Sequence, residues 1–297
     1  MNLHLMWLTL QQHTTFCLVM GGVLGLVLGS FLNVVILRIP ARMMNEWRQE
    51  AHEVLELPMP EEAEADQTPG IEAHSRCPGC KTPIRWRDNI PVLSYLLLRG
   101  KCRACGMRIS LQYPLVELIS ALIGLGLTAY LGVGIPLLLG SFLFLMLLTL
   151  AVIDGRTMLL PDGLVYSVLW VGLLASALQW PHMPSLPHAV FGAVAGWLSL
   201  WGMFWLFKLI RGREGLGYGD FKLFAALGAW CGIAGLIPIM VIATGTALLG
   251  ALLWWLARRD AWGPFPFGPA LAIGGAVQWL FPTWFTQVLQ MWVNALH

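Results

Sequence analysis

Long apolar runs occupy most of this sequence, and they constrain its fold more than any other feature. A helix needs about 20 apolar residues to cross the hydrocarbon core of a bilayer, and several runs have this length. Of the 297 residues, 57% are hydrophobic and only 11% are charged, whereas about 25% of the residues of a soluble domain are charged. This composition excludes a soluble enzyme, a disordered chain and a disulfide-rich secreted module. It predicts an all-α polytopic membrane protein.

The apolar runs predict about eight transmembrane helices. The stretch 221–257 is too long for one span, and we expect a hairpin that breaks near Gly232–Gly235. With this hairpin all eighteen Lys and Arg residues fall on one side of the membrane, which the positive-inside rule identifies as the cytosol. Both termini are then external. The other predicted spans lie near residues 16–37, 114–131, 135–153, 163–180, 189–207 and 265–282.

The predicted chain has three parts. Residues 1–37 form an external N-terminus and the first transmembrane helix, and residues 111–297 form a membrane-embedded domain with the other seven helices. Between them lies a cytosolic loop, made of an acidic linker (43–72) and a small module (73–110). We interpret the linker as solvated and partly disordered, with an acidic surface for a basic partner as the alternative. The net charge of +2 does not indicate nucleic-acid binding.

A few small and polar residues indicate how the helices pack. Gly21, Gly25 and Gly29 share one face of the first span, and this pattern predicts close approach of another helix. Asn33 is interpreted as a hydrogen-bonding residue between helices. Glu117 stands in the first turn of its span, where a carboxylate complements the helix dipole.

Two Cys-x-x-Cys pairs predict a metal site in the cytosolic module. They are separated by 21 residues and consist of Cys77, Cys80, Cys102 and Cys105. This spacing is typical of a tetrahedral four-cysteine zinc site of the ribbon type, in which each pair spans one edge of the tetrahedron. Disulfides are the alternative, but they rarely persist in the cytosol. Because four thiolates leave no position for water, we expect the zinc ion to be structural.

Carboxylates are the candidates for catalysis within the membrane. The sequence has no His-Glu-x-x-His metal motif and no phosphate-binding loop, and no His lies well inside a predicted span. Asp154 ends the third span and Asp220 opens the sixth, so both return to the same face. Two adjacent carboxyls share a proton, so that one can activate water while the other polarises a peptide carbonyl. Asp162 is interpreted as a helix-start residue, and the same interpretation stays open for both other aspartates.

Several motifs resemble those of the bacterial type IV prepilin leader peptidase/N-methyltransferase family. They occur in the family's order over about residues 16–275. The resemblance implies an intramembrane aspartic protease with Asp154 and Asp220 as the catalytic pair, and with the four cysteines as zinc ligands. The matching motifs are Gly29-Ser-Phe-Leu-Asn33-Val-Val-Ile-Leu-Arg38-Ile-Pro40, the two Cys-x-x-Cys pairs, Asn89-Ile-Pro-Val-Leu-Ser-Tyr95, Leu98-Arg-Gly-Lys-Cys102, Tyr113-Pro-Leu-Val-Glu117, the segment around Asp154, Gly217-Tyr-Gly219-Asp220 and Pro266-Phe-Gly-Pro269.

The resemblance also implies a bifunctional enzyme of the bacterial inner membrane. Such enzymes remove the basic leader of type IV prepilins, or of type II secretion pseudopilins, after a glycine on the cytosolic side. They then N-methylate the new amino terminus with S-adenosylmethionine, an activity to which the cysteine module is tied. The sequence shows no methyl-donor motif, and Asn33, Arg38 and Glu117 are the candidates for part of that site. The expected partners are the pilin substrates and membrane lipid.

Two other classes of protein stay open. A zinc-stabilised transporter or scaffold could use the two aspartates to bind a proton or a cation, and it would retain its function when cleavage chemistry is blocked. A presenilin-like or signal-peptide-peptidase-like protease shares Gly-x-Gly-Asp, but the cysteine module and the Asn33 motif disfavour it. Since some relatives with the peptidase motifs lack the cysteine module and the methylase, a peptidase-only enzyme is a further alternative.

Overall fold

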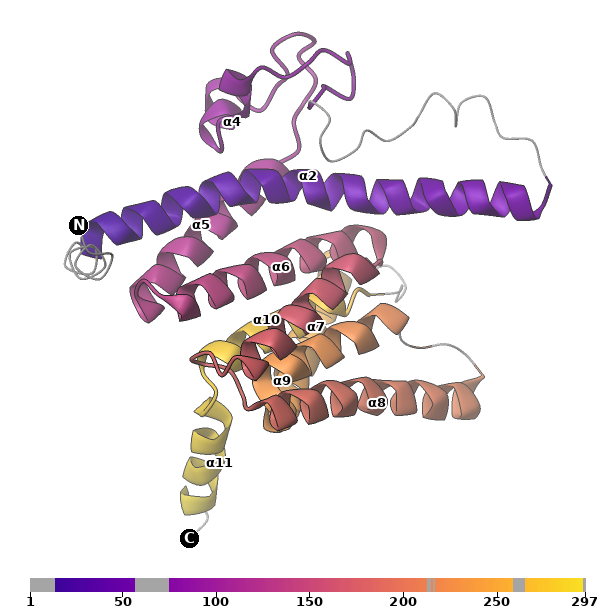
Figure 1. Ribbon diagram of the computed structural model, residues 1–297. Helices are drawn as coiled ribbons and strands as arrows, with labels where there is room; N and C mark the ends of the chain where they lie inside the picture. Colours follow the sequence, from indigo (N-terminus) through magenta and orange to yellow (C-terminus); the bar gives the residue numbers. More distant parts are fainter. Residues whose placement is uncertain (1–13, 57–74, 213–214, 216, 259–264, 296–297) are drawn as a thin grey trace. The chain divides into compact units, whose positions relative to one another are not determined.

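The computed structural model describes residues 14–56, 75–212, 215, 217–258 and 265–295, and these residues are mostly helical (Figure 1). Two isolated β-bridges are the only strand-like pairings among them, which confirms the predicted all-α fold. The helices are α2 (Thr14–Val54), η1 (Trp86–Asn89), α4 (Leu93–Leu97), α5 (Gln112–Leu131), α6 (Ile135–Thr157), α7 (Asp162–Ala177), α8 (Leu186–Arg211), α9 (Tyr218–Arg258), α10 (Gly268–Leu280) and α11 (Trp284–Ala295).

Five of the described helices are long and apolar enough to cross a membrane, namely α2, α5, α6, α8 and α9. The 16-residue α7 is a shorter apolar helix. Together they make the chain an integral membrane protein. When α9 is counted as two arms, these helices correspond to seven of the predicted spans, and α10 occupies the position of the eighth.

The chain reverses direction inside α9, at Gly232. This residue has φ 70° and ψ 175°, which no α-helix contains. On either side of it, Leu227 and Ile239 would be about 18 Å apart along a straight helix. They nevertheless contact two consecutive residues of α10, because Leu227 touches Gly275 and Ile239 touches Gly274. The hairpin that the sequence predicts near Gly232 is therefore confirmed.

The structure forms two compact units, Met1–Leu145 and Met146–His297. In the first unit, α2 packs along α5 through the glycines on its surface. Gly25 touches the backbone of Ser120, and a Cβ on Gly29 would lie 2.8 Å from the Ser120 hydroxyl. This contact confirms the predicted close packing of the first span against another helix.

In the second unit, the first arm of α9 is enclosed by its neighbours, since α9 packs against α7, α8 and α10. The indole of Trp230 is buried, and its N–H donates to the carbonyl oxygen of Val168 on α7 (2.8 Å). The same ring lies against Gly172. On the opposite side, the backbones of Gly228 and Gly192 are in contact. These contacts fix the first arm of α9, which carries Asp220 in its first turn.

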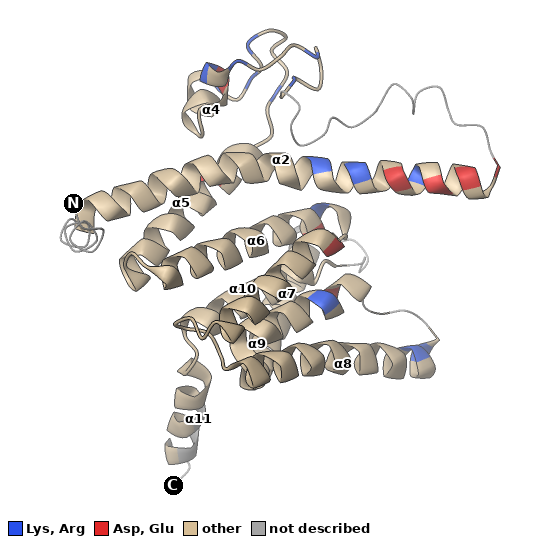
Figure 2. Cartoon of the chain, viewed as in Figure 1, with Lys and Arg blue, Asp and Glu red and all other residues tan. Residues whose placement is uncertain are grey.

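The helix α2 continues beyond its apolar part to Val54, through residues 43–54 that the sequence assigned to a partly disordered linker. Figure 2 shows that the charged residues of α2 lie in its C-terminal half. Opposite charges stabilise this extension, because Arg42 forms an ion pair one turn away with Glu46 (2.7 Å). The remainder of the predicted linker, from residue 57, lies outside the described residues.

Candidate functional site

Asp154 is held at the end of α6 by the backbone of α10. The N–H of Gly268 donates to Oδ2 of Asp154 (2.9 Å). A Cβ at position 268 would lie 2.7 Å from the same oxygen, so the position requires glycine. The sequence contained Gly268 in a matching motif, but nothing in the sequence alone connected it with Asp154.

Asp220 stands in the first turn of α9, and the glycines before it serve two purposes. The N–H of Asp220 donates to the carbonyl oxygen of Gly217 (3.2 Å). A Cβ on Gly219 would lie 2.8 Å from the side chain of Leu160, so this glycine allows the α6–α7 connection to approach. The carboxyls of Asp154 and Asp220 are within range of electrostatic interaction with one another.

These two aspartates are buried, with exposed fractions of 5% for Asp154 and 8% for Asp220. Among the described residues of the second unit they are the only buried charged side chains. Burying an ionisable group in a membrane protein is costly, and such groups therefore mark functional sites. A pair of carboxyls is chemically suited to acid–base hydrolysis, in which one group is ionised and the other protonated.

Asp162 is the first residue of α7, as the sequence indicates, but its side chain does not cap the helix. It lies in the first turn of the helix without a side-chain capping bond. Its two oxygens instead accept hydrogen bonds from Nζ of Lys222 (2.7 and 2.8 Å). The Lys222 ammonium also lies 5.6 Å from the ring centre of Tyr166. This ion pair connects the start of α7 with the residue two positions after Asp220, and no pattern in the sequence indicates it.

The four predicted zinc ligands come together in the first unit. The sulfur atoms of Cys77, Cys80, Cys102 and Cys105 all lie within 4.8 Å of one another. The distance between the sulfurs of Cys77 and Cys105 is 3.8 Å, which matches the spacing of about 3.8 Å for two sulfurs bound at about 2.3 Å to one tetrahedral zinc ion. Hydrogen bonding with the side chain and backbone of Thr82 lowers the pKa of Cys80 to about 6. The donor set therefore fits a metal ion that binds thiolates.

The two cysteine pairs have the same backbone structure, which the spacing alone did not reveal. In each pair the N–H that follows the second cysteine donates to the carbonyl oxygen of the first, from Lys81 to Cys77 (2.8 Å) and from Gly106 to Cys102 (2.9 Å). Lys81 and Gly106 both have positive φ, 56° and 72°. An antiparallel bridge closes each loop. The module is thus built from two equivalent knuckles that face a common site.

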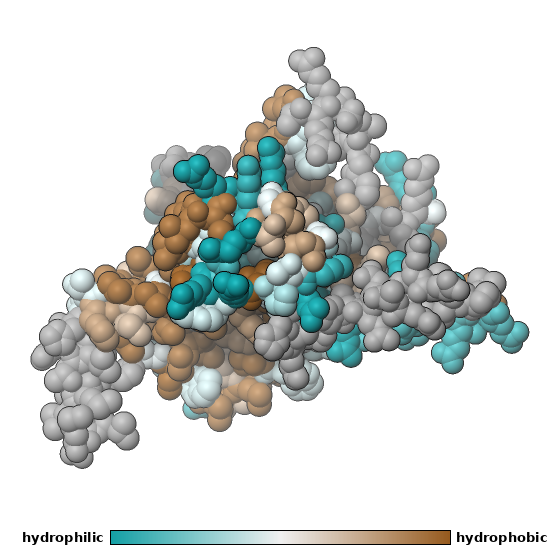
Figure 3. All heavy atoms as spheres, turned by 90° about the horizontal axis from the view of Figure 1, so that it is seen from above, coloured by the Kyte–Doolittle hydropathy of each residue, from teal (hydrophilic) through white to brown (hydrophobic). Residues whose placement is uncertain are grey.

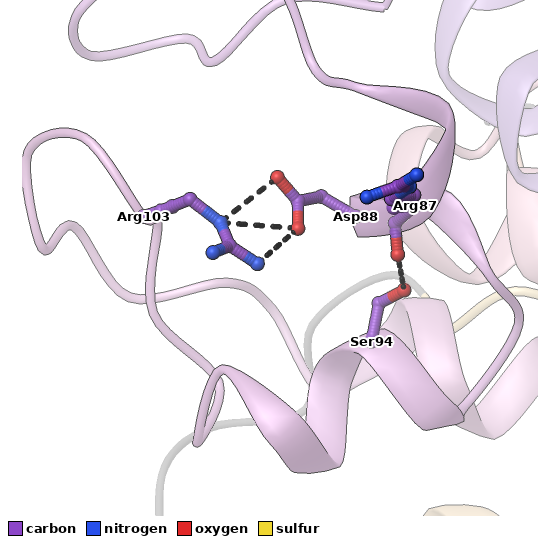
Figure 4. Close-up of polar contacts among 4 residues, drawn as sticks. All are labelled: Arg87, Asp88, Ser94 and Arg103. Atoms are coloured by element: carbon purple, nitrogen blue, oxygen red, sulfur yellow. Dashed lines mark hydrogen bonds and ion pairs between the residues drawn. The ribbon is translucent and has the colours of Figure 1, made fainter.

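A short helical insert, η1 and α4, connects the two knuckles. The guanidinium of Arg103, in the second knuckle, donates to both oxygens of Asp88 in η1 (Nε distances 3.1 and 3.0 Å; Figure 4). The hydroxyl of Ser94 in α4 donates to the carbonyl oxygen of Arg87 (3.1 Å). The ion pair between Arg103 and Asp88 therefore holds the insert against the second knuckle.

The candidates for a methyl-donor site are positioned by the helix pair of the first unit. Nδ2 of Asn33 donates to the carbonyl oxygen of Tyr113 (3.0 Å), which confirms the predicted bond between helices. Glu117 is buried, and its Oε2 accepts the N–H of Val92 (2.7 Å). Because α5 begins at Gln112, Glu117 does not lie in its first turn, and the interpretation as a dipole-complementing residue is wrong. The Glu117 carboxyl contacts the cysteine module instead. Arg38 lies farther along α2 and is half-buried.

Comparison with known proteins identifies relatives of the whole chain. Residues 23–131 match the family model described as "Bacterial Peptidase A24 N-terminal domain", and residues 141–255 match "Type IV leader peptidase family". A protein of Xanthomonas campestris pv. campestris called "Prepilin leader peptidase/N-methyltransferase" is 45% identical over 90% of this chain and 92% of its own length. Proteins with the same name from Pseudomonas putida (44% identical; 94% of each chain) and Dickeya chrysanthemi (46%; 86% and 89%) are similar. No solved structure matches the chain.

Proposed function

Because this chain belongs to the type IV leader peptidase family, we propose that it cleaves the leader from type IV prepilins or pseudopilins and then methylates the new amino terminus. The observation that carries the proposal is the joint burial of Asp154 and Asp220, the described charged residues that the second unit encloses. An aspartic peptidase needs two carboxyls close enough to interact, and the electrostatic interaction between Asp154 and Asp220 supports this assignment.

Asp154 and Asp220 perform the cleavage in this proposal. The ionised carboxyl takes a proton from a water molecule, which attacks the scissile carbonyl, while the protonated carboxyl donates a hydrogen bond to the carbonyl oxygen. Gly268 holds Asp154 in place from α10, and Gly217 fixes the backbone of Asp220. The substrate peptide bond must therefore reach the ends of α6 and α9.

We place this site at the cytosolic face of the bacterial inner membrane. A leader rich in Lys or Arg stays in the cytosol, while the apolar helix that follows it enters the bilayer. The scissile bond then lies at the interface. Asp154 lies close to the end of an apolar helix and Asp220 to the start of another, which is the depth that such a substrate requires.

The cysteine module is assigned to the methylation half. Cys77, Cys80, Cys102 and Cys105 would hold a zinc ion in a closed tetrahedron, and its contribution is to fix the two knuckles and the insert between them. S-adenosylmethionine would supply an electrophilic methyl group to the new α-amino nitrogen. Apart from the two isolated bridges, the described residues contain no strand, so they offer no doubly wound nucleotide fold to bind this donor.

The test compares purified wild-type protein with Asp154→Asn, Asp220→Asn and Cys80→Ser, and it scores leader removal and methyl incorporation separately. We expect each Asp variant to lose at least about 1,000-fold in cleavage rate and still to methylate a substrate that was cleaved beforehand. Cys80→Ser should cleave normally but lose bound metal and methylation. Asp88→Asn, which changes a carboxyl outside the membrane helices, is the control for cleavage. Normal cleavage by either Asp154→Asn or Asp220→Asn would refute the aspartate pair.

A further inference from the structure

The insert of the cysteine module reaches the depth of the transmembrane part of α2. The N–H of Val92, the residue before α4, donates to Oε2 of Glu117 on α5 (2.7 Å). The Glu117 side chain is also hydrogen-bonded to Ser30 of α2. Arg38 is the first charged residue of α2. Because a helix rises 1.5 Å per residue, Ser30 lies about 12 Å from Arg38 on the apolar side.

The outward face of α4 is made of leucines. Leu93, Leu96 and Leu97 share one side of the helix and have exposed fractions of 49%, 65% and 73%. Ser94 lies beside this leucine face and is buried, and its hydroxyl donates to the Arg87 carbonyl (Figure 4). The helix therefore holds the module through Ser94 and leaves the three leucine side chains about half exposed or more.

The backbone before α4 has a conformation that would be unfavourable in lipid without a partner. Val92 has φ 59° and ψ −47°, a positive-φ conformation that a β-branched residue rarely adopts. A free backbone N–H is unfavourable in the hydrocarbon region, so irregular backbone occurs there only where protein groups pair with it. The Glu117 carboxylate provides this pairing. A buried carboxylate on a membrane helix is otherwise costly. The hydrogen bond with Val92 explains why Glu117 is buried at this position.

The module that carries this apolar face is strongly basic. Residues 75–110 contain eight Lys and Arg residues and one Asp. The guanidinium of Arg87 lies 5.2 Å from the ring centre of the exposed Trp86, a combination typical of the headgroup region. Figure 3 shows hydrophobic residues directly beside hydrophilic ones on the surface seen from above. Anionic phospholipids attract such a basic surface.

From these observations we propose that α4 is a membrane anchor that dips into one leaflet of the bilayer. Leu93, Leu96 and Leu97 lie in the hydrocarbon beside α2 and α5, and the basic residues around them bind lipid phosphates. The lipid bilayer is the partner of this surface. The cysteine module is then held against the membrane at three places, its two chain ends and α4, rather than suspended in water by its ends alone.

Photo-crosslinking tests the anchor directly. The full-length protein is prepared with benzoylphenylalanine in place of Leu97, and separately in place of Lys81 as an exposed control in the first knuckle. Both are reconstituted in bilayers of phosphatidylethanolamine and phosphatidylglycerol. We expect a lipid adduct at position 97 with a yield roughly tenfold above that at position 81, since only the former faces hydrocarbon. Equal yields at the two positions would overturn the proposal, and so would an adduct at position 97 that forms only with an added prepilin and contains that protein.

A second measurement separates the anchor from the fold of the module. Amide hydrogen exchange of residues 93–98 is followed in Leu96→Asn/Leu97→Asn and in the conservative Leu96→Met/Leu97→Met. We expect exchange to rise roughly tenfold in the Asn variant and to stay unchanged in the Met variant, because only Asn weakens insertion. Bound Co²⁺ should give the same visible spectrum in both, which shows that the four cysteines remain in place. Unchanged exchange in an Asn variant with an intact Co²⁺ spectrum would refute the anchor.

Discussion

The backbone N–H of Gly268 donates to Oδ2 of Asp154 across 114 residues of sequence (2.9 Å). Gly268 is the first residue of α10, where the N–H groups of a helix have no partner within the helix. One of these free donors is thus used to orient a buried carboxyl at the end of α6. In the proposed reaction, α10 sets the position of a catalytic group without contributing a side chain.

Gly268→Ala should therefore strongly slow cleavage without unfolding the protein. The new methyl group would lie 2.7 Å from Oδ2 of Asp154, so the carboxyl must move. A displacement of about 1 Å at a reacting group costs on the order of 100-fold in rate. We expect a loss of this size in kcat for leader removal, measured with purified prepilin.

Gly155→Ala is the matched control, because Gly155 adjoins Asp154 on α6 and its new methyl group would have no neighbouring atom within 4 Å. It should cleave at nearly the wild-type rate. If Gly268→Ala cleaves as well as Gly155→Ala, the backbone of α10 does not position Asp154.

The ion pair between Asp162 and Lys222 should have a small effect on cleavage. Both side chains are partly exposed, at 54% and 27%, and exposed pairs contribute about 1 kcal/mol or less. Asp162→Ala should thus lower the cleavage rate by roughly two- to fivefold, in contrast to the loss expected for Asp154→Asn. Steady-state rates of leader removal measure the difference.

The exchanged pair Asp162→Lys/Lys222→Asp is the control for this ion pair, and it should recover part of the lost rate. A loss as large as that of Asp154→Asn, without recovery in the exchanged pair, would show that Asp162 is itself catalytic.

Much of the fold can be predicted from local patterns in the sequence. Hydropathy and charge placement predict the helices and the reversal at Gly232, and the glycine stripe predicts the contact of α2 with a neighbouring helix. The extension of α2 to Val54 was not predicted, because acidic, solvated sequence favours a disordered linker and an exposed helix equally well. The ion pair between Arg42 and Glu46 is a local signal that could have indicated the helix.

The candidate site likewise has some features that local sequence patterns predict and some contacts that they do not. Spacing predicts that the cysteines cluster, and topology predicts that Asp154 and Asp220 end on one face. The contacts of Gly268 with Asp154, of Lys222 with Asp162 and of Glu117 with Val92 depend on tertiary packing between segments far apart in the chain. No periodicity or motif in a single sequence encodes such pairs.

The acidic end of α2 should contribute to binding of a basic leader. Glu50, Glu53 and Glu56 are exposed, and a negative surface raises the local concentration of a cationic peptide. Replacing all three by Gln should raise the KM for prepilin roughly threefold to tenfold at low salt, and the effect should vanish near 0.5 M salt, where charges are screened. Glu46→Gln is the control, because Glu46 is already paired with Arg42. A KM change that is independent of salt would exclude the electrostatic explanation.

The contact between α2 and α5 should tolerate no methyl group at Gly25. A Cβ there would overlap the backbone of Ser120, and forcing a group into a packed interface costs about 1 to 3 kcal/mol. Gly25→Ala should therefore lower the thermal midpoint of the purified protein by several degrees.

Gly22→Ala is the matched control, since the nearest atom to its new methyl would be the Leu125 side chain at 3.8 Å, an ordinary contact. Because Gly22 and Gly25 share the same helix, intrinsic helix propensity affects both variants equally, and a difference between them measures the interface. If both variants melt at the same temperature, the glycine stripe does not determine how closely α2 and α5 pack.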